Sequence, residues 1–137
     1  MTDFSSLDIE QVLYLHEKII ERSGGAQGVR DFALLHSGLE RCKATYAGDD
    51  LYPTIYKKAG ALLHSLVMNH AFLDGNKRTA YETMKRFLYV NNYYIDANTE
   101  KIISLCLAVD NEGMSVGQIS QWLQKNKRKI KKSHLLK

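Results

Sequence analysis

The chain of 137 residues lacks the features that mark secreted, membrane or multidomain proteins. It has only two cysteines, Cys42 and Cys106, too few for a disulfide framework and not in metal-ligand spacing. No apolar run approaches the roughly 20 residues that cross a bilayer. The N-terminus shows neither the basic segment nor the apolar core of a signal peptide. We therefore expect one cytoplasmic domain with reduced thiols and no membrane partner.

The net charge of +4 is concentrated at the C-terminal end of the chain. Residues 125–137 hold seven of the 19 Lys and Arg residues and none of the 15 Asp and Glu residues. Residues 1–124 thus have 12 basic and 15 acidic side chains, a net charge of −3. We expect a single domain over residues 1–124 and a solvated basic tail over 125–137. Nucleic acid is not the expected partner, although such a tail could contact RNA or another polyanion.

Apolar residues recur every three or four positions in six segments, a spacing typical of amphipathic helices. The strongest stripe runs from Ile55 to Val67 and leads into His70; Pro53, the only proline, is expected in the first turn of that helix. A fourth helix is expected from about Asn76 to Asn91. The other four helices are expected to follow polar caps, namely Ser5–Asp8, Asp31, Asn98 or Thr99, and Ser115. The predicted fold is an all-α, single-domain bundle of about six helices.

A polar junction separates the third and fourth of these helices, with the sequence His-Ala-Phe-Leu-Asp-Gly-Asn-Lys-Arg-Thr-Ala over residues 70–80. Gly75 precedes the helix start and leaves room for a ligand. The first N–H groups of a helix lack intrahelical partners and bind phosphate well. Lys77 and Arg78 in a first turn are disfavoured by the helix dipole unless an anion binds there. Asn76 can also donate to a phosphate. The junction therefore predicts an anion site.

Two further side chains make this site chemically active. Asp74 beside phosphates is a natural magnesium ligand, because Mg²⁺ is usually held by one or two carboxylates together with phosphate oxygens. His70 lies four residues earlier and can take up a proton near neutral pH, so it is a candidate general base. The set predicts phosphoryl or nucleotidyl transfer.

Each of these residues also has a purely structural interpretation. Asp74 and Asn76 could be caps, and Arg78 could pair with Glu82 four residues on. His16 and His64 are expected to be structural histidines. A purely structural role is expected more readily for any single residue of the junction than for all of them together.

The order His-x-Phe-x-Asp-Gly-Asn-Lys-Arg resembles the signature of the Fic/Doc family, specifically its death-on-curing (Doc) toxin branch. Residues 24–31 resemble the early loop of that branch, and the similarity covers roughly residues 7–125. The resemblance implies an all-helical domain with a Fic-type loop, and ATP and Mg²⁺ as co-substrate and cofactor. It implies that Phe72 anchors the loop, and that residues 46–54 form a flap that aligns the target peptide. It also implies His70 as the general base, Asp74 as the magnesium ligand, and Gly75, Asn76, Lys77 and Arg78 as phosphate ligands.

Two positions bear on the reaction. Lys77 stands where AMP-transferring Fic proteins usually have glycine, and Tyr81 stands where they have a second arginine. The resemblance therefore implies transfer of the γ-phosphate of ATP to a Ser or Thr hydroxyl of a target protein, with elongation factor Tu as the candidate. AMP transfer on the same scaffold and a non-catalytic anion-binding regulatory domain are the alternatives.

An inhibitory Ser/Thr-x-x-x-Glu-Gly/Asn helix, present in many Fic proteins, is not found. Glu112-Gly113 has Ala108 at the required Ser/Thr position. The resemblance implies instead a toxin–antitoxin pair, in which a separate Phd-like antitoxin folds into a groove of this protein.

Overall fold

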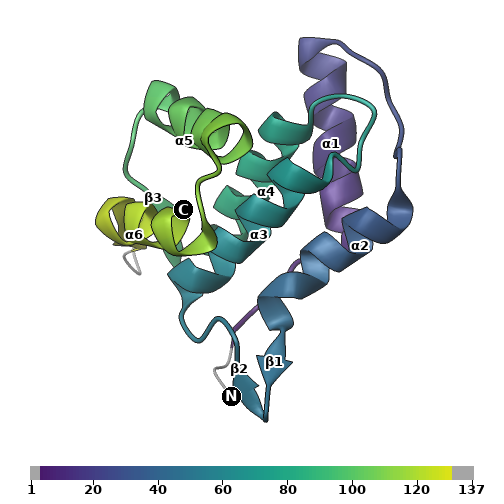
Figure 1. Ribbon diagram of the computed structural model, residues 1–137. Helices are drawn as coiled ribbons and strands as arrows, with labels where there is room; N and C mark the ends of the chain where they lie inside the picture. Colours follow the sequence, from purple (N-terminus) through teal and green to yellow (C-terminus); the bar gives the residue numbers. More distant parts are fainter. Residues whose placement is uncertain (1–3, 131–137) are drawn as a thin grey trace.

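The computed structural model describes residues 4–130 of the chain, which form six α-helices (Figure 1). A short 3₁₀ helix, η1, follows the second of them. The expectation of an all-α bundle of about six helices is confirmed. The helices are α1 (Ile9–Ser23), α2 (Phe32–Glu40), α3 (Ile55–Asn69), α4 (Asn76–Val90), α5 (Thr99–Glu112) and α6 (Val116–Asn126), and η1 spans Arg41–Lys43.

Polar caps set most of the helix starts, as the sequence predicted. Asp8, Asp31, Asn98 and Ser115 each accept a hydrogen bond from the backbone N–H three residues later. These bonds satisfy N–H groups that have no partner within the helix. The expectation for Pro53 is wrong, because α3 begins after an N-cap at Thr54, whose hydroxyl accepts from the backbone N–H of Lys57. Pro53 therefore lies outside the helix.

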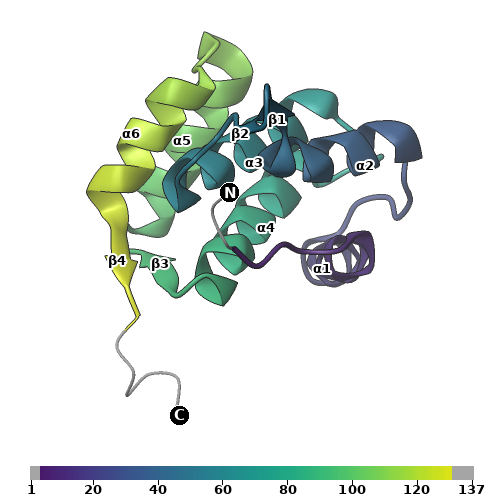
Figure 2. The ribbon, with the colours of Figure 1, turned by 90° about the horizontal axis from the view of Figure 1, so that it is seen from below.

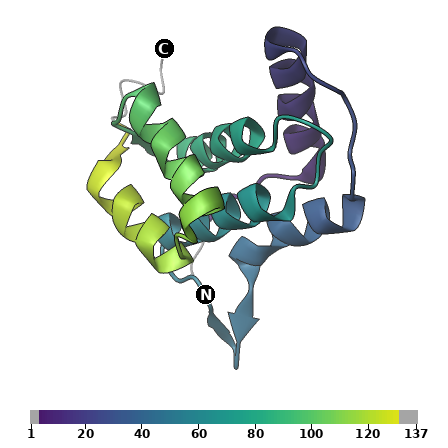
Figure 3. The same ribbon diagram turned by 45° about the horizontal axis from the view of Figure 1, so that its top comes forward.

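Helix α3 forms the centre of the bundle. It packs against α2, α4, α5 and α6, and nine of its fifteen residues are buried. Helices α1 and α2 lie on one side of the central α3–α4 pair, and α5 and α6 lie on the other (Figures 1 and 3). The fully buried Lys58 is neutralised by Asp50 at 3.3 Å and donates to the carbonyl of Cys42. This buried ion pair attaches the segment after η1 to α3. In the part of the chain described, no helix is both long and apolar enough to cross a membrane.

Two small antiparallel strand pairs complete the fold (Figure 2). β1 (Thr45–Tyr46) pairs with β2 (Asp49–Asp50), and β3 (Tyr93–Ile95) pairs with β4 (Lys127–Lys129). The structure therefore differs from the tail expected from residue 125. The end of α6 and β4 lie within residues 125–130, and Ile130 is buried. Residues 131–137 of the expected tail lie outside the described residues.

The β1–β2 hairpin does not lie beside the polar junction. Its Asp50 contacts Lys58 near the start of α3, whereas His70 follows the last residue of that helix. The fifteen residues of α3 rise about 22 Å, and Figure 1 shows the hairpin and the junction at opposite ends of it. The expectation of a flap beside the site at residues 46–54 is therefore wrong for this structure. The loop between α1 and α2 lies beside the junction instead.

Candidate functional site

His70 caps the C-terminal end of α3 in the left-handed conformation, with φ 48° and ψ 49°. A non-glycine residue is rarely found there, and such positions persist only where the surroundings hold them. Here Arg30 supplies the support: its Nε donates to the carbonyl of His70 at 2.7 Å, and its Nη2 donates to the carbonyl of Asn69 at 3.0 Å. The imidazole itself is about half exposed. The histidine backbone is thus fixed while its side chain stays accessible.

The loop between α1 and α2 braces the junction along its length. Backbone N–H groups of Arg30 and Asp31 donate to the carbonyl of Ala71, and Leu73 N–H donates to the carbonyl of Gly28. Gly25 has φ 113°, and a Cβ there would lie 3.3 Å from the side chain of Asp74. The loop approaches this closely because glycine adopts such backbone angles without strain.

Phe72 anchors the junction in the core, as expected for it. Its ring is buried and stacks on that of His16, with centroids 3.8 Å apart and planes 9° from parallel. Nε2 of His16 donates to the carbonyl of Asp74 at 2.8 Å. The buried His16 therefore has a structural role, as expected, and holds the loop from the α1 side.

The N-terminus of α4 is left without a side-chain cap. Gly75 precedes it with φ 74°, and a Cβ there would lie 3.0 Å from Cδ1 of Ile20. Asn76 accepts from the backbone N–H of Phe72 and donates to its carbonyl, both at 2.9 Å. One amide hydrogen and the backbone N–H of Asn76 thus remain for an anion. This geometry leaves the positive end of the helix dipole available to a phosphate.

The two cations of the first turn of α4 have different surroundings. Nζ of Lys77 lies 2.8 Å from Oδ2 of Asp110, a residue of α5. Nε of Arg78 lies 3.8 Å from Glu82, and its guanidinium lies 5.7 Å from the centre of the Tyr81 ring. Because Arg78 is largely exposed and the Glu82 contact is longer than a hydrogen bond, its donors remain available to a ligand.

Asp110 is a site residue that the sequence analysis missed. Its Oδ1 lies 3.6 Å from Nε2 of His70, so one carboxylate faces both the candidate base and Lys77. The hydrogen bond from Lys77 is the main cause that lowers the pKa of the Asp110 carboxyl below its usual value. One signal could have drawn attention to it: an acid in the last turn of a helix is disfavoured by the dipole, as a cation in a first turn is. Asp110 and Lys77 are such a pair on two different helices.

Asp74 suits the magnesium role predicted for it. It is exposed at the loop surface, and its Oδ2 accepts from the backbone N–H of Ala26 at 2.8 Å. A hard carboxylate oxygen matches Mg²⁺, which takes its other ligands from phosphates and water. Among residues 4–130, no cluster of three or more His, Cys, Asp and Glu side chains could hold a metal alone.

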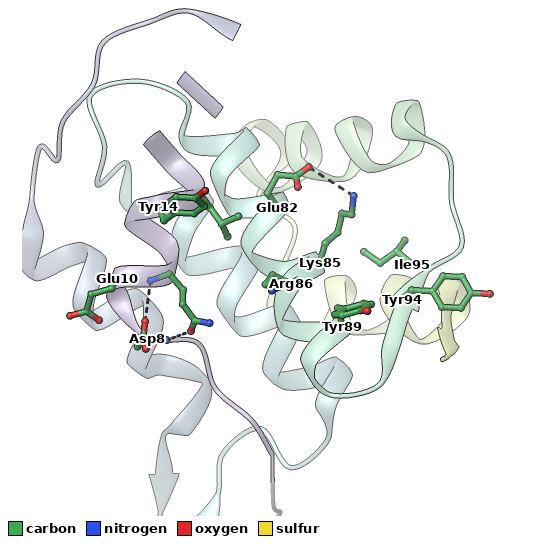
Figure 4. Close-up of a pocket in the computed structure, with 11 residues that line it drawn as sticks. Asp8, Glu10, Tyr14, Glu82, Lys85, Arg86, Tyr89, Tyr94 and Ile95 are labelled. Carbon is green, nitrogen blue, oxygen red and sulfur yellow. Dashed lines mark hydrogen bonds and ion pairs between the residues drawn. The ribbon is translucent and has the colours of Figure 1, made fainter. Parts of the chain in front are cut away.

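A groove of about 710 Å³ lies between α1 and α4 and reaches β3 (Figure 4). Its exposed aromatic residues are Tyr14, Tyr89 and Tyr94. Glu82, which faces Arg78, also lines it. The groove thus runs from the first turns of α4 towards the end of that helix.

Comparison with known proteins agrees with this geometry. A family model described as the Fic/DOC family matches residues 6–88. Over 75 residues the chain is 47% identical to a protein named Toxin Doc from Mycolicibacterium smegmatis, a match that covers 55% of this chain and 58% of that protein. Over 111 residues it is 28% identical to Protein kinase doc of Escherichia phage P1, with 81% of this chain and 82% of that protein covered.

The chain belongs to the Fic/DOC family. Both relatives named above are Doc proteins, which supports the Doc branch. The match spans little more than half the length of the mycobacterial toxin, so activity, targets and partners are matters for proposal.

Proposed function

We propose that this protein is a Doc-like toxin that transfers the γ-phosphate of ATP to a Ser or Thr hydroxyl of a target protein. One observation carries the proposal: the Asp110 carboxylate bridges His70 and Lys77, so the candidate base lies next to a cation at the open N-terminus of α4. A base and a phosphate cradle side by side are what in-line transfer to a hydroxyl requires.

The residues divide the work as follows. Backbone N–H groups at the start of α4, with Lys77 and Arg78, hold the phosphates of ATP. A magnesium ion held by Asp74 would neutralise phosphate charge. His70 takes the proton of the target hydroxyl while the hydroxyl oxygen forms a bond to the γ-phosphorus. The bond from that phosphorus to the β–γ bridging oxygen breaks, and ADP leaves.

Transfer of phosphate is favoured over transfer of AMP by the residue at position 81. Tyr81 is buried, and the side chains of Arg78 and Lys85 lie over its ring. It supplies no cation where AMP-transferring family members have a second arginine. The name of the phage P1 relative, a protein kinase, supports the same choice. The target implied by the family resemblance is a translation factor, elongation factor Tu.

Labelled ATP tests the reaction. Purified protein, Mg²⁺ and cell lysate are incubated with ATP labelled at the α or the γ phosphate. We expect label on a protein from γ-labelled ATP only, and a loss of about 100-fold or more in His70→Ala. The matched control is His36→Ala, an exposed histidine of α2, which should keep the activity. Label from α-labelled ATP would instead support AMP transfer. Absence of His70-dependent label from both labelled forms of ATP would favour a non-catalytic anion-binding domain.

We further propose that the α1–α4 groove receives the antitoxin. Its exposed tyrosines suit the apolar face of an amphipathic helix, and its Glu82 end adjoins Arg78. A bound helix could therefore block the nucleotide site. A small reading frame directly upstream of the gene would be the candidate antitoxin, and its co-expression should suppress labelling. Tyr89→Lys in the groove should weaken that suppression, whereas Tyr46→Lys on the distant hairpin should not. Equal effects would contradict this location.

A further inference from the structure

Among residues 4–130, Asp110 is the one carboxylate that contacts both the candidate base His70 and the cation of Lys77. Each of its oxygens has a separate partner: Oδ2 lies 2.8 Å from Nζ of Lys77, and Oδ1 lies 3.6 Å from Nε2 of His70. The carboxylate is 18% exposed, against 48% for the imidazole. Asp110 is therefore the more buried partner of the two.

We propose that Asp110 is a positioning residue that keeps the neutral His70 imidazole protonated on Nε2, so that Nδ1 is free to take the proton of the target hydroxyl. This inference rests on the proposed function. An ionised carboxylate only accepts hydrogen bonds. The ring nitrogen that faces it must therefore carry the hydrogen, because a lone pair in that place would be repelled.

Lys77 stabilises the position and charge of Asp110 beside His70. Its short contact keeps the carboxylate in place and ionised, so that Asp110 remains an acceptor throughout the working pH range. When His70 takes a proton, the resulting imidazolium lies beside a negative charge that stabilises it. A buried aspartate serves serine proteases in the same two ways, by fixing the tautomer and by stabilising the imidazolium.

The distance of 3.6 Å to Oδ1 is longer than a hydrogen bond. Catalytic hydrogen bonds are often long in the absence of substrate and shorten when it binds. The exposed imidazole is free to make that small movement, because only the backbone of His70 is held by Arg30.

The first test uses nitrogen NMR of the His70 imidazole, with the signal assigned by its loss in His70→Gln. In the unaltered protein at neutral pH we expect the Nε2–H form to dominate. In Asp110→Asn the asparagine amide can donate to Nε2, so the Nδ1–H form should increase. This measurement needs neither ATP nor a target. It therefore decides the tautomer claim even if the labelling experiment fails.

The second test measures turnover with γ-labelled ATP. Asp110→Asn should lower kcat about 10- to 100-fold, by analogy with residues that hydrogen-bond metal-binding histidines, while the KM for ATP changes by less than about threefold. Asp110→Glu should restore part of kcat, since it retains the charge. The matched control is Asp96→Asn, an exposed carboxylate paired with Arg128 at 3.4 Å, which should leave kcat unchanged.

Two outcomes would overturn the proposal. An unchanged tautomer and unchanged kcat in Asp110→Asn would show that the contact does not position the histidine. Tighter ATP binding with higher kcat would show instead that the carboxylate occupies the phosphate position and competes with the nucleotide. Thermal melting of each variant establishes that it is folded before either result is interpreted.

Discussion

Two helix junctions of this protein satisfy the backbone groups at their helix ends in opposite ways. Between α5 and α6, Gly113 adopts the left-handed conformation and its N–H bonds back to Ala108. Ser115 then starts α6 with a capping box, in which its side chain and that of Gln118 satisfy each other's backbone N–H groups. All of these bonds are made within a few residues of one another.

The α3–α4 junction relies on distant residues and leaves one end open. The left-handed position is held by His70 rather than glycine, and its carbonyl is bonded by Arg30 from another segment. Helix α4 starts after Gly75 with no side-chain cap. The difference favours an anion at α4 rather than at α6: side chains bond the N–H groups of Ser115 and Gln118 at the start of α6, whereas no side chain caps the start of α4.

The largest difference in stability is expected between alanine variants of the glycines at the two junctions. Gly75→Ala should lower the free energy of unfolding by about 2–4 kcal/mol, since it combines left-handed strain with a Cβ 3.0 Å from Ile20. Gly113→Ala should cost only about 1–2 kcal/mol, because its Cβ meets nothing within 4 Å. Urea unfolding of both variants measures the difference. Equal losses would show that the crowding at Gly75 has no energetic weight.

A smaller effect is expected from removal of the long-range support. Arg30→Ala should lower the free energy of unfolding by about 1 kcal/mol, since two hydrogen bonds to carbonyls are lost from an exposed side chain. It should also slow phosphate transfer, because the left-handed conformation of His70 is no longer held. Arg22→Ala, an exposed arginine in the last turn of α1, should change the stability by no more than about 0.5 kcal/mol and leave transfer intact. An unchanged transfer rate in Arg30→Ala would show that Arg30 is not needed to hold the backbone of His70.

The smallest functional effect is expected at the capped junction. Ser115→Ala should cost about 1 kcal/mol of stability through loss of its cap, and yet leave ATP affinity unchanged. Calorimetric titration with ATP and Mg²⁺ measures that affinity. Weaker ATP binding in Ser115→Ala would mean that the two junctions are not independent, and would undermine the comparison.

Features that depend on neighbours along the chain were predictable. The caps at Asp8, Asp31, Asn98 and Ser115 follow from bonds that span three residues. Lys77 and Arg78 were identified because cations in a first turn conflict with the dipole of their own helix. A short-range conflict of this kind is visible in the sequence even when its resolution is not.

Apart from the start of α3, where Thr54 rather than Pro53 precedes the first turn, the features missed by the sequence analysis join segments far apart in the chain. Asp110 meets His70 and Lys77 only after α5 packs beside α3 and α4. The α1–α2 loop replaces the hairpin beside the site because its backbone pairs with the junction at Val29 and Phe72. Strand β4 forms from residues that looked like a basic tail, since strand pairing depends on a distant partner and not on charge.

The sequence by itself determined the helices, their order, and the row of polar groups from His70 to Arg78. Tertiary structure decided which of those groups face one another and which residues support them. The physical reason is range: caps and helix dipoles act within one turn, whereas the contacts of Arg30, His16 and Asp110 with the junction exist only once the helices have packed.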